Sequence, residues 1–251
     1  MADPLLAVRG VSRSFGGLKA VSDISLDVPE GSLSALIGPN GAGKTTLFAL
    51  VSGFLKPDGG SVHFQGEDIT GREPYRNAML GMTRTFQIVQ PFAQQTVRQN
   101  IAVGAHLRTA SRRAALAQAE EVAGRVGLAA QLDKAASDLT VAGRKRLELA
   151  RALATRPRLL LLDEVLAGLN PAEIADMIPV VRGIAGSGIT VLMIEHVMQA
   201  VMNLAQQVWV LAQGQLIAQG TPAQVTRDER VIEAYLGHGM AARLRAAQVR
   251  A

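Results

Sequence analysis

The sequence predicts an α/β fold whose centre is a mainly parallel sheet covered on both faces. Three short runs, at 33–41, 159–165 and 190–196, are almost continuously apolar. Strands of a parallel sheet show this pattern because neither side of the strand meets water. Segments with helical spacing, at 44–54 and 171–185, follow two of these runs. Strands that alternate with helices along the chain are typical of α/β proteins.

The first half of the chain contains two regions that depart from this alternation. The N-terminal stretch, through residues 24–28, alternates apolar and polar residues, which favours antiparallel strands with one solvated face. The run 33–41 then forms a strand that ends in a glycine-rich turn, and 44–54 continues as a helix. Residues 96–138 are rich in alanine and have no strand signal, so we interpret them as an inserted helical lobe.

The second half returns to strands and helices. The four leucines at 159–162 predict a buried strand. Asn170 is expected to cap the helix 171–185, with Pro171 in its first turn. Residues 208–220 have the pattern of a hairpin.

These elements predict one domain, 1–251, with three parts. The parts are a core with an antiparallel β lobe at 1–90 and 155–220, a helical lobe at 91–154 and a C-terminal extension at 221–251.

Composition excludes several classes of protein. The chain has no cysteine, so it has no disulfide framework. It shows no signal peptide and no apolar run long enough to span a bilayer, so we expect a soluble, cytoplasmic chain. The charge of +5 is mild and aromatic residues make up only 4%, so we expect no nucleic-acid partner. We interpret the basic cluster Arg144, Lys145 and Arg146 as a solvated face.

The turn after the first apolar run has the pattern of a phosphate-binding P-loop. Residues 38–45 read GPNGAGKT, which fits G-x-x-x-x-G-K-[ST] between a strand and a helix. The glycines allow the backbone N–H groups to point inward at an anion, and the start of the helix adds partial positive charge. Lys44 is expected to reach the β- and γ-phosphates, and the Thr45 hydroxyl is expected to bind Mg²⁺.

Three further polar residues follow apolar strands at the same predicted sheet edge. Asp163 ends the four-leucine strand and is the natural carboxylate for the metal, directly or through water. Glu164 follows it and can orient or deprotonate the attacking water. His196 ends the next strand, where it can sense the γ-phosphate.

The order of these motifs resembles the nucleotide-binding subunit of ATP-binding-cassette (ABC) transporters over nearly the whole chain. Phe15 matches the aromatic residue on which adenine stacks, and Gln87 matches the glutamine that touches Mg²⁺ and the attacking water. Residues 167–170, AGLN, match the loop that crosses between subunits. The resemblance implies a P-loop NTPase with a RecA-like core, an antiparallel β lobe and an inserted helical lobe.

The segment LTVAGRKRLELARAL, at 139–153, is similar to the family signature LSGGQ-x-x-R-x-x-x-ARAL. The serine of the signature is Thr140 here, and its two glycines are Val141 and Ala142. In the family, this segment of one subunit contacts the γ-phosphate of ATP bound to the other. A Cβ is tolerable at these positions where φ is negative and costly where φ is positive. Ala142 adds only a methyl group, so Val141, with its larger side chain, is the greater concern. We expect the clamp to work, with Thr140, Ala142 and Gly143 in contact with nucleotide.

The resemblance thus implies a set of site residues and partners. The cofactors are ATP and Mg²⁺. The partners are a second nucleotide-binding subunit, integral membrane permease subunits and, indirectly, a periplasmic solute-binding protein, which places the chain peripherally at the cytoplasmic face of the membrane. The catalytic residues are Glu164, His196, Gln87 and Lys44, and the metal ligands are Thr45, Gln87 and Asp163. The nucleotide-binding residues are Phe15, Gly38, Asn40, Gly41, Ala42, Gly43, Lys44, Thr45, Thr46, Thr140, Ala142 and Gly143.

The end of the chain favours one group of transporters. Residues 220–237 are similar to the tail of ATPases that serve branched-chain amino-acid importers, and they predict a helix exposing Val231, Ile232, Tyr235 and Leu236. Such a helix either packs ordinarily on the core or has a regulatory role. The closing basic segment, 240–251, is a solvated end or lies near anionic lipid.

Other functions stay open on the sequence alone. One alternative is the ATPase of a lipid or lipopolysaccharide exporter. Another is an ATP-binding regulatory cassette with low turnover, which the altered signature keeps possible. Cassettes that act on ribosomes or DNA usually carry two P-loops or a long coiled coil, and this chain has neither.

Overall fold

The computed structural model describes residues 3–88 and 90–237. The predicted strands and helices that frame the P-loop are present, and Asn170 caps α6 through a capping box. The strands are β1 Leu6–Phe15, β2 Leu18–Val28, β3 Leu33–Ile37, β4 Gly59–Phe64, β5 Glu67–Asp68, β6 Met82–Arg84, β7 Leu159–Asp163, β8 Thr190–Ile194, β9 Gln207–Ala212 and β10 Gln215–Gly220. The helices are α1 Lys44–Ser52, α2 Pro74–Leu80, α3 Val97–Ala105, α4 Arg112–Arg125, α5 Val141–Leu153, α6 Pro171–Gly186, α7 Met198–Leu204, α8 Pro222–Val225 and α9 Glu229–Leu236.

The central sheet has six strands in the order β10-β9-β3-β8-β7-β6. The five strands from β9 to β6 are parallel, and β10 pairs antiparallel with β9 as the predicted hairpin. The order places β3, β7 and β8 side by side, so the turns that follow them meet at one edge of the sheet.

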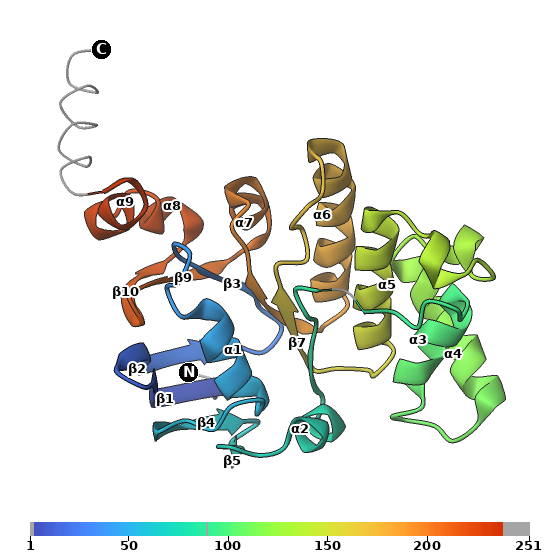
Figure 1. Cartoon of the computed structure of the whole chain (residues 1–251), viewed down its shortest axis with the longest axis horizontal. Coiled ribbons are helices and arrows are strands. Elements are labelled where there is room, and N and C mark those ends of the chain that lie inside the picture. The colour runs from blue at the N-terminus through green and yellow to red at the C-terminus, as the bar shows by residue number, and fades with distance from the viewer. Residues whose placement is uncertain (1–2, 89, 238–251) are drawn as a thin grey trace, which may run out of the picture.

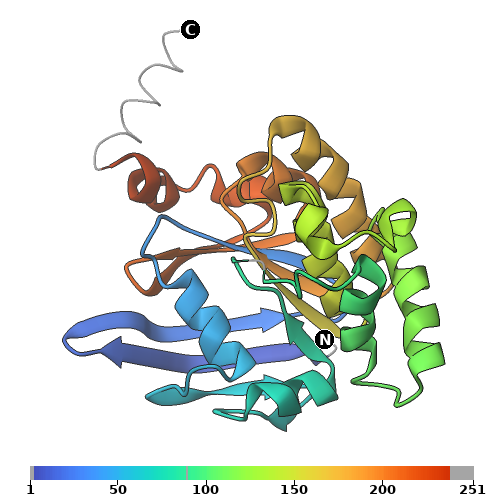
Figure 2. The same ribbon diagram turned by 45° about the vertical axis from the view of Figure 1, so that its right-hand side comes forward.

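One face of this sheet is covered by α1 and by a second sheet (Figures 1 and 2). That sheet is antiparallel, with the order β2-β1-β4-β5, and it is the lobe that the N-terminal alternation predicts. Leu36, Leu161 and Leu192 of the central strands join Phe48 of α1 and Val8 of β1 in one buried cluster. Helix α1, which begins at the P-loop, is therefore fixed between two sheets.

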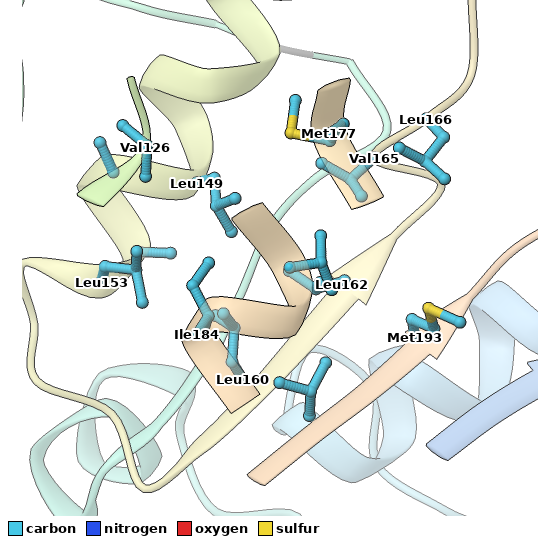
Figure 3. Close-up of a cluster of buried hydrophobic side chains, with 14 of the residues drawn as sticks. Val126, Leu149, Leu153, Leu160, Leu162, Val165, Leu166, Met177, Ile184 and Met193 are labelled. Carbon is cyan, nitrogen blue, oxygen red and sulfur yellow. The ribbon is translucent and has the colours of Figure 1, made fainter. Parts of the chain in front are cut away.

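The opposite face of the sheet is covered by helices. Leu160 and Leu162 of β7 face Ile184 of α6, with Leu149 of α5 close by (Figure 3). Alternate residues of β7 thus belong to different cores, as the period of two requires. The same cluster continues into α3 and α4, so the inserted helices and the sheet share one core.

The fold class is confirmed, with one detail that differs from the sequence prediction. Val231 of α9 is buried rather than exposed, because it packs into the helical-face core, whereas Tyr235 and Leu236 are exposed. At Val231, therefore, the last helix packs on the core in the ordinary way, which is one of the two alternatives that the sequence left open. The predicted basic segment 240–251 lies outside the described residues.

Candidate functional site

The P-loop joins β3 to α1 and depends on glycine at two tight positions. Gly38 has φ of 153°, and a Cβ there would lie 2.1 Å from the carbonyl oxygen of Leu211. Gly43 has φ of 100°, and its Cβ would lie 2.3 Å from the carbonyl oxygen of Ala20. Any larger residue at either position would displace backbone, so the shape of the turn requires glycine at 38 and 43.

Helix α1 begins at Lys44 without a side-chain cap, whereas Thr96, Thr140 and Asn170 cap α3, α5 and α6. An uncapped first turn directs backbone N–H groups and positive partial charge toward the cleft in front of it. The fold therefore presents an anion site where the sequence motif predicts one.

The Lys44 side chain folds back over the loop. Its Nζ donates hydrogen bonds to the carbonyl oxygens of Gly38 at 2.8 Å and Pro39 at 3.0 Å. Burial lowers the pKa of Lys44, and the negative charges of Glu164 and Asp163 act in the opposite direction. A phosphate at this position would favour the ammonium form further.

The P-loop borders a cleft of about 1030 Å³, here called the P-loop cleft. Gly38, a predicted nucleotide-binding residue, is not in the lining of the cleft, and its backbone is hydrogen-bonded to Tyr235 of α9, a contact that the sequence did not predict. Phe15, at the end of β1, lies at the cleft with 44% of its surface exposed, so it is not a core aromatic. The predicted residues that line the cleft are Phe15, Asn40, Gly41, Ala42, Gly43, Lys44, Thr45, Thr46, Gln87, Glu164 and His196.

Asp163 ends β7 and is 1% exposed. Its Oδ2 accepts a hydrogen bond from the Arg84 guanidinium at 2.7 Å, while its Oδ1 is buried with no hydrogen-bond partner among the described residues. Asp163 lines a neighbouring groove together with Thr45 and Gln87. The three predicted metal ligands therefore lie together. The sequence analysis did not predict a role for Arg84, because Arg84 is brought close to Asp163 only by the pairing of β6 with β7.

Glu164 has an unusual backbone conformation, with φ of 49°. Its N–H donates to the carbonyl oxygen of Ile194 at 3.0 Å, and its side chain accepts a hydrogen bond from Gln87 Nε2 at 2.7 Å. A non-glycine residue in the left-handed region costs free energy that surrounding contacts must offset. The strain and the hydrogen bond together fix the carboxylate at the floor of the P-loop cleft.

His196 lies two residues beyond the end of β8 and is exposed at the P-loop cleft. The preceding residue, Glu195, is fully buried and accepts a hydrogen bond from the backbone N–H of Leu166 at 3.0 Å. Leu166 directly precedes the AGLN segment, so Glu195 connects that segment to the His196 loop.

The signature residues lie apart from both clefts within one chain, since neither lining includes 139–143. Thr140 is the N-cap of α5, and its Oγ1 accepts the Gly143 N–H at 3.1 Å. Val141 and Ala142 are helical, so their φ angles are negative and a Cβ is accommodated without strain. Val141 directs an exposed side chain into solvent.

One interpretation of the signature region is wrong at a single residue. Arg144 of the basic cluster at 144–146 is exposed, as a solvated face requires, but Lys145 is only 5% exposed. Its ammonium is inside the protein, between α5 and the catalytic loops.

Comparison with known proteins gives the same assignment as the geometry. Residues 21–167 match the family model described as ABC transporter, and 215–241 match the model described as branched-chain amino acid ATP-binding cassette transporter. The chain belongs to the ABC transporter ATP-binding family. It is an ATP-hydrolysing cassette of that family.

Several curated ABC proteins are similar to this cassette along nearly their whole length. The high-affinity branched-chain amino acid transport ATP-binding proteins LivG of Salmonella typhimurium and BraF of Pseudomonas aeruginosa are each 39% identical to it, and each match covers 94% of this chain and 99% of the relative. A solved structure of MJ1267, an ATP-binding cassette of an ABC transporter, superposes with a TM-score of 0.87 at 32% identity, covering 94% of this chain and all of that chain. No helix in the described part of this ABC cassette has the length and hydropathy that a membrane span requires.

Proposed function

We propose that this chain is the ATP-hydrolysing subunit of an ABC importer, which energises uptake of branched-chain amino acids through separate membrane subunits. The observation that carries the substrate class is the match of 215–241 to the branched-chain cassette model, and similarity to LivG and BraF supports it. The P-loop cleft supplies the chemistry. Lys44 and the first turn of α1 bind the phosphates, Phe15 stacks on the base, and His196 contacts the γ-phosphate.

Glu164 is the residue proposed to orient and deprotonate the attacking water. Gln87 donates a side-chain amide hydrogen to Glu164, so its side-chain oxygen, Oε1, can face water or metal. Both residues line the P-loop cleft, as Phe15 does.

Mg²⁺ is proposed to bind Thr45, Gln87 and Asp163. The buried Asp163 Oδ1, which has no hydrogen-bond partner in the described chain, fits a cation ligand because hard cations prefer carboxylate oxygen. When bound with ATP, Mg²⁺ neutralises phosphate charge. Calorimetric titration checks this assignment: Asp163→Asn should remove the extra affinity that Mg²⁺ gives ATP, and an unchanged affinity would contradict it.

A second nucleotide-binding subunit is needed to complete the site. The signature residues of the same chain do not line the P-loop cleft, so Thr140, Ala142 and Gly143 are proposed to contact the nucleotide of a partner cassette. Helix α5 is long enough for its N-terminal dipole to act on the γ-phosphate, and its cap leaves the backbone shape of the turn defined.

The membrane subunits are proposed to dock at the groove between the core and the inserted helices. This groove, of about 680 Å³, is lined by residues of both parts, including Phe86, Ile88, Val103 and Arg151. Ile88 is 74% exposed, and the exposed apolar side chains Phe54, Phe86, Phe92 and Val103 also contribute to this region. Apolar side chains gathered in this way favour a protein partner. Docking there places the chain at the cytoplasmic face of the membrane, with a periplasmic solute-binding protein acting through the membrane subunits.

The test is uptake by cells from which this gene has been deleted. Uptake of labelled leucine, isoleucine and valine should fall on deletion and return with the unaltered chain, but not with Lys44→Ala, which removes the phosphate-binding cation. Ile88→Asp should also fail, because a charge in the docking groove should prevent co-purification with the membrane subunits. Met202→Asp alters an equally apolar exposed site on α7, outside both clefts, and should restore uptake.

Unchanged branched-chain uptake in the deletion strain would contradict the importer proposal. Accumulation of lipid or lipopolysaccharide in the inner membrane of that strain would instead support the exporter alternative.

A further inference from the structure

Lys145 is a buried cation that neither the P-loop nor the signature sequence explains. It lies one turn into α5 and is 5% exposed. Its Nζ donates hydrogen bonds to two backbone carbonyl oxygens, those of Gln87 and Glu164, both at 3.2 Å. The carboxylates of Glu148 and Glu195 are close enough to interact electrostatically with this ammonium. A buried ammonium requires such partners, so its position is well defined.

The two carbonyls belong to the two residues whose side chains face the reacting end of the cleft. Gln87 and Glu164 are also joined directly by the side-chain hydrogen bond of 2.7 Å. One ammonium therefore fixes the backbone of both partners in that hydrogen bond. Because Glu164 has φ of 49°, a contact to its carbonyl group helps to hold a conformation that an isolated residue would seldom adopt.

Other side chains on the same face of α5 contact the chain around Gln87. Glu148 accepts a hydrogen bond from the Phe86 N–H. Arg151 donates to the Gln90 carbonyl oxygen at 2.9 Å, and its guanidinium lies 5.1 Å from the centroid of the Phe92 ring. Residues 145, 148 and 151 are spaced by three along the helix, which places them on one side. Of these three, Lys145 is the one that also donates a hydrogen bond to Glu164, on the loop after β7.

We infer that Lys145 is a positioning residue, which holds Glu164 and Gln87 in catalytic geometry and thereby connects the signature helix to the hydrolytic site. This inference rests on the catalytic role proposed for Glu164. Lys145 acts through the backbone of Gln87 and Glu164, the residues proposed to contact the metal and the attacking water. A shift of α5, whose N-terminus is the signature, would move the ammonium and so move the carboxylate of Glu164.

The experiment compares steady-state ATP hydrolysis, ATP binding and melting temperature for a set of variants of the full chain. Lys145→Met keeps the apolar stem and removes the donors, so kcat should fall about 10- to 100-fold while KM for ATP stays within about threefold. Lys145→Arg restores donors and should recover part of kcat. Lys145→Gln has a single donor nitrogen, so its kcat should lie between those of the Met and Arg variants. It tests the inference in place of Lys145→Met if that variant does not fold.

The matched control is Arg182→Met, on helix α6 and outside both clefts. Arg182 donates a hydrogen bond to the carbonyl oxygen of Asn203 at 2.9 Å, so this change also removes a cation that contacts a backbone carbonyl group. It should not lower kcat by more than about twofold. Equal losses of kcat in the Lys145 and Arg182 variants would make Lys145 a structural residue only, and the inference would be overturned.

Glu164→Gln separates this inference from the function on which it rests. If Glu164→Gln retains full turnover, the proposed catalytic role of Glu164 is wrong. If Glu164→Gln removes turnover but Lys145→Met leaves kcat unchanged, the catalytic role stands and the positioning role of Lys145 is wrong.

Discussion

Glu195 is a buried carboxylic acid beside two catalytic loops. One of its oxygens accepts the Leu166 N–H, and the other has no hydrogen-bond partner among the described residues. Burial raises the pKa of Glu195 to about 7, and the negative charge of Glu164 adds to the rise, against the opposing hydrogen bonds and the charge of Lys145. The folded protein therefore favours the protonated acid over the carboxylate at this site.

The consequence is a dependence of stability on pH. Because the folded protein binds this proton more tightly than the unfolded chain, the free energy of unfolding should fall as pH rises from the ordinary glutamate pKa of 4.5 to about 7. The loss amounts to about 3 kcal/mol. Glu195→Gln should flatten this part of the curve and leave the variant more stable at about pH 8 but similar at about pH 5.

Denaturant unfolding of the unaltered chain and of Glu195→Gln across this pH range measures the difference between their free energies of unfolding. Glu121→Gln, at an exposed position of α4, is the control and should follow the unaltered chain. A Glu195 variant that loses stability in parallel with the unaltered chain would show that Glu195 is not the titrating group.

Single residues differ in how far the sequence reveals them. Gly38 and Lys44 could be recognised because the P-loop uses consecutive residues whose chemistry is local. Lys145 could not, because its role depends on two carbonyl groups, 58 and 19 residues distant in the chain. Basic residues in a row indicate a solvated face unless the tertiary contacts of each are known.

At the scale of elements, the five-residue buried strands of the central sheet were predicted and the three-residue edge strand was not. β3, β7 and β8 are buried on both sides, so their composition alone identifies them. β6 has only three residues, Met82–Arg84, and is a strand because β7 pairs with it. Helix α2, which precedes β6, was not predicted either, although Pro74 in its first turn and Gly81 at its C-cap are typical of helix ends. Whether such a segment forms a strand or a helix depends on its pairing and packing with other parts of the chain, and the sequence of the segment alone does not specify those contacts.

Helix α3 packs so closely on α5 that one glycine is required between them. A Cβ on Gly104 would lie 2.3 Å from the carbonyl oxygen of Arg151 and 3.2 Å from the Cβ of Ala154. Gly104→Ala should therefore lower the free energy of unfolding by about 1–3 kcal/mol through overpacking. The two helices must separate to admit the methyl group.

Gly124→Ala is the matched control, in α4 of the same helical region. A Cβ there meets no atom within 4 Å. This change should be neutral or raise stability by up to about 1 kcal/mol, because alanine is the better helix former. Thermal unfolding of the two variants decides the matter: equal melting temperatures would mean that α3 and α5 are not in close contact.

At the scale of the whole molecule, the fold brings distant motifs to one edge of the central sheet. The turns after β3, β7 and β8 carry Lys44, Glu164 and His196, and all three residues line the P-loop cleft. The class of fold and this convergence could be predicted, because the strand order of such sheets follows from short connections and parallel pairing. The position of the signature relative to the cleft could not be predicted from the order of motifs alone.

The separation of the signature from the cleft is the feature on which the account of ATP use depends. A cassette that binds ATP from one side alone has Thr140 and Ala142 exposed or half-buried at the start of α5, with no nucleotide to contact. When two copies face each other, each copy can supply its signature residues to the ATP bound at the P-loop of the other. ATP would then favour the paired form because it gains contacts there that the single cassette does not offer.

The most direct measurement is the molecular mass of Glu164→Gln with and without ATP, by light scattering. The account predicts a dimer only with ATP, and predicts that Thr140→Ala combined with Ala142→Asp returns the protein to monomer, because a carboxylate would face the γ-phosphate. A control pair, Thr109→Ala with Ala110→Asp outside α5, should leave the dimer intact. ATP-driven dimerisation that persists undiminished in the Thr140 and Ala142 variant would contradict the two-sided site.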